Sequence, residues 1–181
     1  MTKKTANDNV KFKKGDHIVY PAHGVGRVIG VEKESVAGFD IEVYVVSFEQ
    51  DKMTLRVPTA KAVASGMRPL ASDTVLKDAL KTLTGKAKVK RTMWSRRAQE
   101  YEAKINSGEI VLIAEVTRDL FRPDDQPEQS YSERQIFEAA SSRLARELAA
   151  MEKTDEPTAL EKILDVLREH APQYYENAED A

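Results

Sequence analysis

The chain has 181 residues, enough for one large domain or two small ones, and 41% of them are hydrophobic, an ordinary share for a folded protein. Its formal net charge is −2, and it has no cysteine, which excludes disulfides, thiolate metal sites and a cysteine nucleophile. No stretch approaches the ~18 apolar residues of a membrane span, and residues 1–9 lack the apolar core of a secretory signal, so we expect a cytoplasmic protein that does not associate with membranes.

Residues 11–70 are predicted to form a small β-domain in which tight turns join four short strands. The predicted strands are His17–Tyr20, Val25–Glu32, Ile41–Phe48 and Met53–Val57. In the last strand, three apolar residues share one face and the two polar residues between them share the other: Met53, Leu55, Val57; Thr54, Arg56. Four short strands within about 50 residues are typical of an SH3- or Tudor-like β-barrel.

The hydrophobic period changes to that of a helix near residue 73, and residues 71–170 are predicted to form a compact all-α domain of about five helices. Asn106-Ser107-Gly108 ends one helix, and Ser130 with Glu133 forms a capping box that begins the longest one. The predicted core face of that longest helix comprises Phe137, Ala140, Leu144, Leu148 and Met151. The fold class is therefore α+β with two domains, and we expect residues 1–10 and the acidic tail 171–181 to be disordered.

The single tryptophan, Trp94, lies within a basic stretch, although the whole chain is slightly acidic. From Lys81 to Lys104, eight cations face two carboxylates. A flat aromatic side chain among cations is how a protein presents a stacking or wedging group to a nucleic acid, because the cations hold phosphates. DNA is therefore the partner to consider, and the candidate contacts besides Trp94 are Lys88, Lys90, Arg91, Arg96 and Arg97.

A second interpretation of Trp94 places it in the core. Trp94, Ala98, Tyr101 and Ile105 follow one another at helical spacing and form one apolar stripe. Large aromatic side chains are highly buried on average. If Thr92 is the N-cap, however, Trp94 falls in the first helical turn, where a side chain can extend beyond the domain edge. From the local residues alone, both interpretations stay open.

Residues that could carry catalysis are sparse. His17, His23 and His170 fall on a strand, a turn and the last helix, and no pair of them has metal-ligand spacing. The serines are not arranged as a nucleophile elbow. We therefore expect no enzyme, no cofactor and no metal site.

The β-domain has its own binding feature. Small open barrels present strand edges to which a partner can add a strand. Arg56, on the polar face of the last predicted strand, could pair with an acidic residue of a partner; the alternative is an ordinary surface arginine.

Several stretches together closely resemble the CarD-like/CdnL family of bacterial RNA polymerase-binding transcription regulators. The resemblance covers about residues 12–167, with the motifs in the order and spacing of the family. The stretches that carry it are Phe12–Gly24 (FKKGDHIVYPAHG), Leu55–Pro58 (LRVP), Trp94–Arg97 (WSRR), Ser107-Gly108 and Ala114–Leu120 (AEVTRDL).

The resemblance implies that the Tudor-like domain docks on the RNA polymerase β subunit and that the helical domain contacts promoter DNA near the −10 element. Carried over by motif, Arg56 is a β-subunit contact, and Trp94 is a wedge in the minor groove at the upstream edge of the bubble. Arg96 and Arg97 are the neighbours of Trp94 on the DNA backbone. Such a protein stabilises the open promoter complex. The other expected RNA polymerase-binding residues, on the same strand, are Met53, Thr54 and Leu55.

On this basis we expect a monomer that needs no cofactor and associates with the nucleoid through RNA polymerase. The alternative function is a polymerase-bound protein adaptor without direct DNA contact. Two positions depart from the family pattern. Gln99 stands where some members have lysine, and Glu34, beside Lys33, stands where some have arginine.

Overall fold

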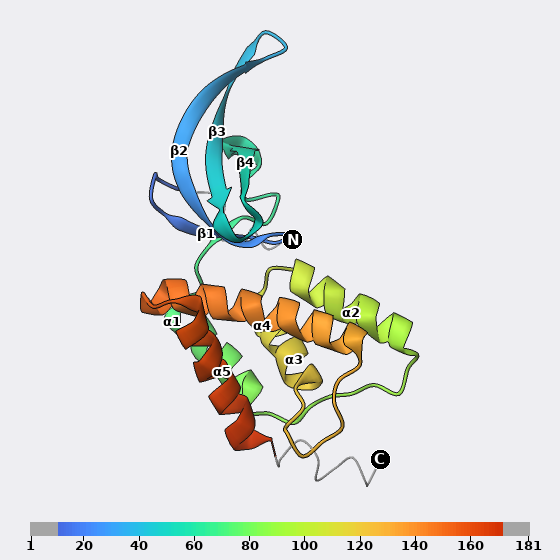
Figure 1. The fold of residues 1–181 in the computed structure, drawn as a ribbon. Coiled ribbons are helices and arrows are strands. Elements are labelled where there is room, and N and C mark those ends of the chain that lie inside the picture. Colours follow the sequence, from blue (N-terminus) through green and yellow to red (C-terminus); the bar gives the residue numbers. More distant parts are fainter. Residues whose placement is uncertain (1–10, 172–181) are drawn as a thin grey trace, which may run out of the picture. The chain divides into compact units, whose positions relative to one another are not determined.

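The computed structural model describes residues 11–171, and the chain divides into two compact units, residues 1–70 and 71–181 (Figure 1). The disorder predicted for residues 1–10 and 172–181 lies outside the described residues. Ala171, which the prediction places in the tail, is instead buried in the apolar cluster of the second unit.

The first unit is a five-stranded antiparallel sheet in the order β4-β3-β2-β1-β5, followed along the chain by the helices (Figure 1). Its strands are β1 His17–Tyr20, β2 Gly24–Val36, β3 Phe39–Phe48, β4 Met53–Pro58 and β5 Arg68–Pro69, with short 3-10 helices η1 Glu49–Asp51 and η2 Thr59–Lys61. In the described residues β4 and β5 lie at the two edges and do not pair with each other, so the sheet is not closed. The predicted Tudor-like β-domain is confirmed, but the two-residue β5 is too short to show a sequence pattern.

Strands β2 and β3 form a long hairpin whose turn follows from its residues. Ala37 and Gly38 have φ values of 50° and 81°. Two consecutive residues with positive φ form the tight turn that matches the twist of paired strands, and glycine adopts it without strain. Val36 and Phe39 are the first pair beyond the turn. The tight turn predicted between the second and third strands is thereby confirmed.

One face of the sheet carries the apolar cluster of the first unit. The buried residues of this cluster are Phe12, Ile18, Val28, Tyr44, Val46, Phe48, Val57, Ala62 and Met67. The chain passes so close to Phe48 at Gly26 that a Cβ atom there would lie 2.7 Å from the Phe48 ring. Gly26 is therefore required by packing, and Gly24, with φ 77°, by its turn.

Within the described residues, the second unit has five helices, as predicted, and its core lies along α3. The helices are α1 Asp73–Leu83, α2 Trp94–Asn106, α3 Ile110–Leu120, α4 Tyr131–Glu152 and α5 Glu156–His170. Helix α3 packs against α1, α2 and α4, and α5 covers α1 and α4. The fully buried residues Leu120, Leu144, Leu148, Ile163 and Leu167 belong to this cluster. Met151 does not join it. It shares a face with Leu144 and Leu148 but is half-buried in the last turn of α4, so that part of the predicted core face is wrong. No helix within residues 11–171 has the length and hydropathy needed to cross a membrane.

The helix ends show which local signals hold. Ser130 and Glu133 form the predicted capping box: the Ser130 hydroxyl accepts from the Glu133 N–H at 3.2 Å, and the Glu133 carboxylate accepts from the Ser130 N–H at 2.9 Å. Gly108, with φ 72°, follows the end of α2 as predicted. The N-cap of α2 is Met93, without a side-chain cap bond, so the prediction of Thr92 is wrong by one residue.

Candidate functional site

Trp94 is the first residue of α2, and its ring is held from three sides. The side chain is half-buried against the helical core. Its Nε1–H donates to the Ser132 hydroxyl at 3.1 Å, and its ring centroid lies 6.3 Å from that of Tyr101. The ring thus packs on the core, as the second interpretation expects, while its position at the helix start leaves one part exposed.

Arg97 braces the same ring. Its guanidinium carbon lies 5.4 Å from the Trp94 centroid and 5.8 Å from the Tyr101 centroid. One of its terminal nitrogens donates to the Tyr101 hydroxyl at 3.3 Å, and its Nε is buried without a partner among the described residues. Because a cation over an aromatic face is attracted to the ring, Arg97 helps to fix Trp94 and is less available for phosphate than its neighbours.

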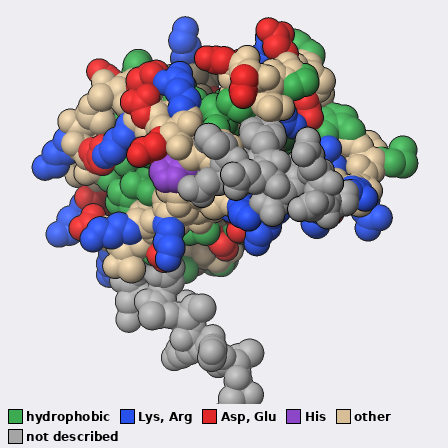
Figure 2. Space-filling model, turned by 90° about the horizontal axis from the view of Figure 1, so that it is seen from below, with side chains coloured by type: hydrophobic (Ala, Val, Ile, Leu, Met, Phe, Trp, Pro, Cys, Tyr) green, Lys and Arg blue, Asp and Glu red, His purple; other side chains and the backbone are tan. Residues whose placement is uncertain are grey.

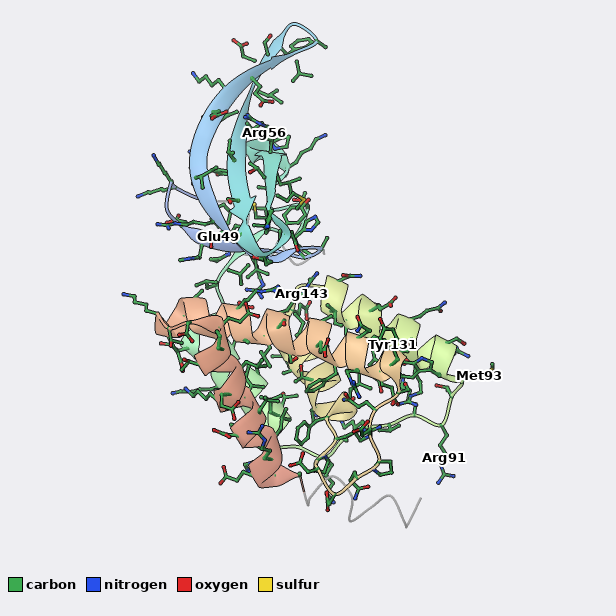
Figure 3. The ribbon with its side chains drawn as sticks, viewed as in Figure 1. Glu49, Arg56, Arg91, Met93, Tyr131 and Arg143 are labelled. Carbon is green, nitrogen blue, oxygen red and sulfur yellow. The ribbon has the colours of Figure 1, made fainter. Side chains whose placement is uncertain are left out.

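Two further apolar side chains project beside Trp94, and the sequence reasoning missed both. Met93 is 79% exposed and Tyr131 is 78% exposed. They lie where α2 and α4 begin, at the same end of the helical unit, and Tyr131 directly precedes the Ser132 that bonds to Trp94 (Figure 3). We call Met93, Trp94 and Tyr131 the apolar edge. The signal that could have revealed Tyr131 is the capping box, because it places this residue at the first helical position.

The predicted cations around the apolar edge differ in how they are held. Lys90 forms an ion pair with Glu100 at 2.9 Å, and this hydrogen bond lowers the pKa of the Glu100 carboxyl. The exposed side chains of Lys88, Arg91 and Arg96 have no hydrogen bond or ion pair to any described residue. These three cations are therefore free to contact phosphate.

A buried ion pair anchors the basic stretch to α3. Arg118 and Asp119 have side chains only 8% and 3% exposed and lie 2.8 Å apart. The same Asp119 oxygen accepts the backbone N–H of Lys88 at 2.9 Å. A buried charge is costly unless it is paired and hydrogen-bonded, so this cluster holds the stretch before Trp94 in one place. Asp119 is a positioning residue that the sequence reasoning did not single out; a charged pair within an apolar helix was the available signal.

The strand expected to dock on a partner, β4, forms an edge of the sheet. Met53 and Leu55 are half-buried against the apolar cluster, whereas Thr54 and Arg56 are exposed on the opposite face, as their alternation predicts. In the described residues β4 pairs only with β3, which leaves its other edge open.

Arg56 does not extend freely from this strand (Figure 3). One of its terminal nitrogens lies 2.7 Å from a Glu32 oxygen and 2.5 Å from a Glu34 oxygen. The hydrogen bonds to Glu32 and Glu34 raise the pKa of the guanidinium. Glu34, one of the two departures from the family pattern, is thus a direct partner of the candidate docking residue.

Comparison with known proteins finds that both units match domain models of the same family. The family model described as "CarD-like/TRCF RID domain" matches residues 12–71, and the model described as "CarD, C-terminal domain" matches residues 78–165. The chain belongs to the CarD-like family. This CarD-like protein is 31% identical over 137 residues to a Bacillus subtilis (strain 168) protein named "Putative transcription factor YdeB", a match that spans 76% of this chain and 90% of the relative.

The family places both candidate sites in a transcription factor. Arg56 falls within the RID match, which implies an interaction with RNA polymerase, and Trp94 falls within the C-terminal match. The family is of transcription-factor type and not an enzyme class. Within residues 11–171 of this CarD-like protein, no three His, Asp or Glu side chains are grouped so that they could hold a metal ion. On the face shown in Figure 2, basic and acidic side chains are interspersed.

Proposed function

We propose that this CarD-like protein docks on the RNA polymerase β subunit through β4 and stabilises the open promoter complex. The apolar edge enters the minor groove near the −10 element, at the upstream edge of the bubble. The observation that carries this proposal is the Trp94 ring, fixed at the start of α2 beside free cations. The protein acts as a monomer and reaches the nucleoid through the polymerase.

The rigidity of the Trp94 ring supports a wedge. Proteins that kink the minor groove insert apolar side chains between base steps and must offset an unstacking cost of a few kcal/mol. A ring already held by Ser132 and Arg97 loses little further freedom on binding. Only part of Trp94 is exposed, so the projecting side chains of Met93 and Tyr131 supply the remaining apolar surface.

The charges explain why the bubble edge is preferred to intact duplex. Contacts from Lys88, Arg91 and Arg96 would neutralise about three phosphates, which corresponds to a salt slope of about −2.7. Three screened contacts barely offset the cost of unstacking a base step. The wedge is favourable where that step is already broken, and docking on the polymerase raises the effective DNA concentration to the mM range.

The effect on transcription follows from differential binding. A ligand shifts an equilibrium only by its difference in affinity for the two states. A preference of about 1.4 kcal/mol for the open over the closed promoter raises their ratio tenfold. Docking through β4 supplies the affinity for polymerase, and the apolar edge supplies the preference for the open over the closed promoter.

The test is the lifetime of the open complex at a promoter with an unstable bubble, measured after adding a competitor. We expect wild type to lengthen it about tenfold and Trp94→Ala to remove most of that effect while still binding polymerase. Val75→Ala, which removes an exposed apolar side chain from α1, is the matched control and should behave as wild type. A Trp94→Ala protein that binds polymerase and fully preserves the lifetime would refute the wedge.

A polymerase-bound adaptor without DNA contact is the second candidate, and the half-burial of Trp94 favours it. If the protein is an adaptor, Trp94→Ala lowers the stability of the fold but does not change any contact with DNA. Crosslinking from position 93 to promoter DNA in the open complex separates the two candidates. A crosslink near the upstream edge of the bubble supports the wedge, whereas crosslinks to protein alone support the adaptor.

A further inference from the structure

The charged group around Arg56 spans three strands of one sheet face. Arg56 on β4 is paired in register with Val45 on β3, and Glu32 on β2 is paired with Val43 on β3. The guanidinium nevertheless reaches Glu32 and Glu34, so the Arg56 side chain crosses β3 to make both ion pairs. We call Arg56, Glu32 and Glu34 the charged triad.

The charged triad shares its sheet face with an apolar strip. Val43 and Val45 alternate with Tyr44 and so point away from the apolar cluster on the other face. They are nevertheless only 2% and 4% exposed. An arginine stem can cover apolar surface while its head remains in water. If Arg56 turned away to a partner, we expect Val45, its register partner on β3, to become more exposed.

The charge of the triad limits which partner fits. One cation and two carboxylates have a net charge of −1. Exposed ion pairs of this kind contribute little to stability, so a partner can displace them. A partner carboxylate that took Arg56 alone would leave Glu32 and Glu34 unpaired beside it. Like charges brought together at an interface oppose binding, which disfavours a purely acidic partner.

We propose that this face fits a partner surface that carries a basic side chain for Glu32 and Glu34 next to an acidic side chain for Arg56. A lysine or arginine meets both needs, because its stem covers Val43 and Val45 while its charge neutralises the carboxylates. Because the Arg56 guanidinium lies 2.7 Å from a Glu32 oxygen, the two partner charges must lie next to each other. This inference rests on the proposed docking of β4 on RNA polymerase.

The test measures binding of the full-length protein to purified RNA polymerase. Glu34→Gln should weaken binding about two- to fivefold, the size expected for one exposed ion pair, and Glu34→Lys should weaken it further. Glu32→Gln is a second, independent variant with the same expectation. Glu42→Gln is the matched control, because Glu42 lies on the same hairpin but on the opposite face from the triad, and it should leave binding unchanged. Thermal melting confirms that each variant is folded.

The outcomes separate this inference from the proposed function. If Arg56→Gln weakens binding but Glu34→Gln leaves it unchanged or strengthens it, the partner offers no basic group here, and the inference is overturned while docking stands. If Arg56→Gln itself leaves binding unchanged, β4 is not the docking strand, and the proposed function fails with it. Weakening by both neutral variants supports the mixed-charge partner.

Discussion

The two candidate sites hold their cations in opposite ways. On β4, Arg56 is paired with two carboxylates of its own sheet. At the start of α2, Arg91 and Arg96 have no such partner among the described residues. Phosphate can bind free cations directly with release of counterions, which makes the binding strongly salt-dependent. A paired cation must exchange one partner for another, which contributes more to specificity than to affinity.

The sites also differ in what positions them. Arg56 stands on a strand edge, with its neighbours supplied by the hairpin register. The apolar edge depends on long-range contacts, because Ser132 of α4 and Asp119 of α3 hold Trp94 and the stretch before it. The apolar edge should therefore be more sensitive to changes away from its surface. Four changes follow, from the largest expected effect to the smallest; the first three test that difference, and the fourth compares helix caps.

The strongest test removes the buried anchor of the basic stretch. Asp119→Ala leaves Arg118 buried without its partner, which should cost roughly 3–5 kcal/mol of unfolding free energy. It also frees the Lys88 N–H, whose hydrogen exchange should become faster. Urea unfolding gives the first quantity and amide exchange the second. Asp124→Ala, in the exposed loop after α3, is the control. A loss below about 1 kcal/mol would show that the pair does not anchor the unit.

A second substitution, Ser132→Ala, tests the orientation of the Trp94 ring without changing how deeply the ring is buried. Ser132→Ala removes the acceptor of the indole N–H and should cost about 1 kcal/mol. Because the ring is then less fixed, the open-complex lifetime should fall with polymerase binding unchanged. Ser142→Ala, further along the same helix and away from Trp94, is the control. Equal lifetimes for Ser132→Ala and wild type would mean that Arg97 and Tyr101 suffice to hold the ring.

Because Arg91 is unpaired among the described residues and Arg56 is paired, DNA binding should depend more strongly on salt concentration than polymerase docking does. Arg91→Gln should make the salt slope of DNA binding shallower by about one, since one phosphate contact is lost. Polymerase docking should show a shallower slope than DNA binding in the wild type, because Arg56 exchanges ion pairs. Titrations at several salt concentrations measure both. An unchanged slope for Arg91→Gln would remove this residue from the DNA contacts.

The smallest expected effect is the pH dependence of the stability that the N-cap of helix α5 contributes. Helix α5 has a side-chain cap, Asp155, whereas α2 has none. Thr158 donates hydrogen bonds to the Asp155 carboxylate from its side chain and from its backbone N–H. Both bonds lower the pKa of this carboxyl. The folded pKa is below the unfolded one, so the stabilisation is complete above the ordinary aspartate range and is lost as the pH falls through the lowered value.

Asp155→Asn tests this assignment, because asparagine caps a helix well but does not titrate. Melting curves of wild type and Asp155→Asn should agree more closely at low pH than at neutral pH if the charge contributes. The same difference at every pH would mean that the carboxylate stabilises α5 only through its shape. The stability of the first turn of α2, which has no side-chain cap, should depend neither on this substitution nor on the pH.

Local patterns were sufficient for most elements. The alternation in Met53–Pro58, the hairpin at Gly38 and the capping box at Ser130 each depend on residues within a few positions of one another. The same local signals failed at β5 and at the N-cap of α2. A two-residue strand exists only because β1 lies beside it, and α2 begins where Trp94 packs against other helices, without a capping side chain.

The sequence by itself determined the order of a Tudor-like β-domain and a helical domain, the family, and the residue types at both sites, because periodicity and motifs are properties of neighbouring residues. Tertiary structure alone decided that Arg56 is paired with Glu32 and Glu34, that Asp119 holds Lys88, and that Tyr131 stands beside Trp94. These contacts join residues 22 to 38 positions apart. Such pairs are brought together by strand register and helix packing, which no single stretch of the chain specifies.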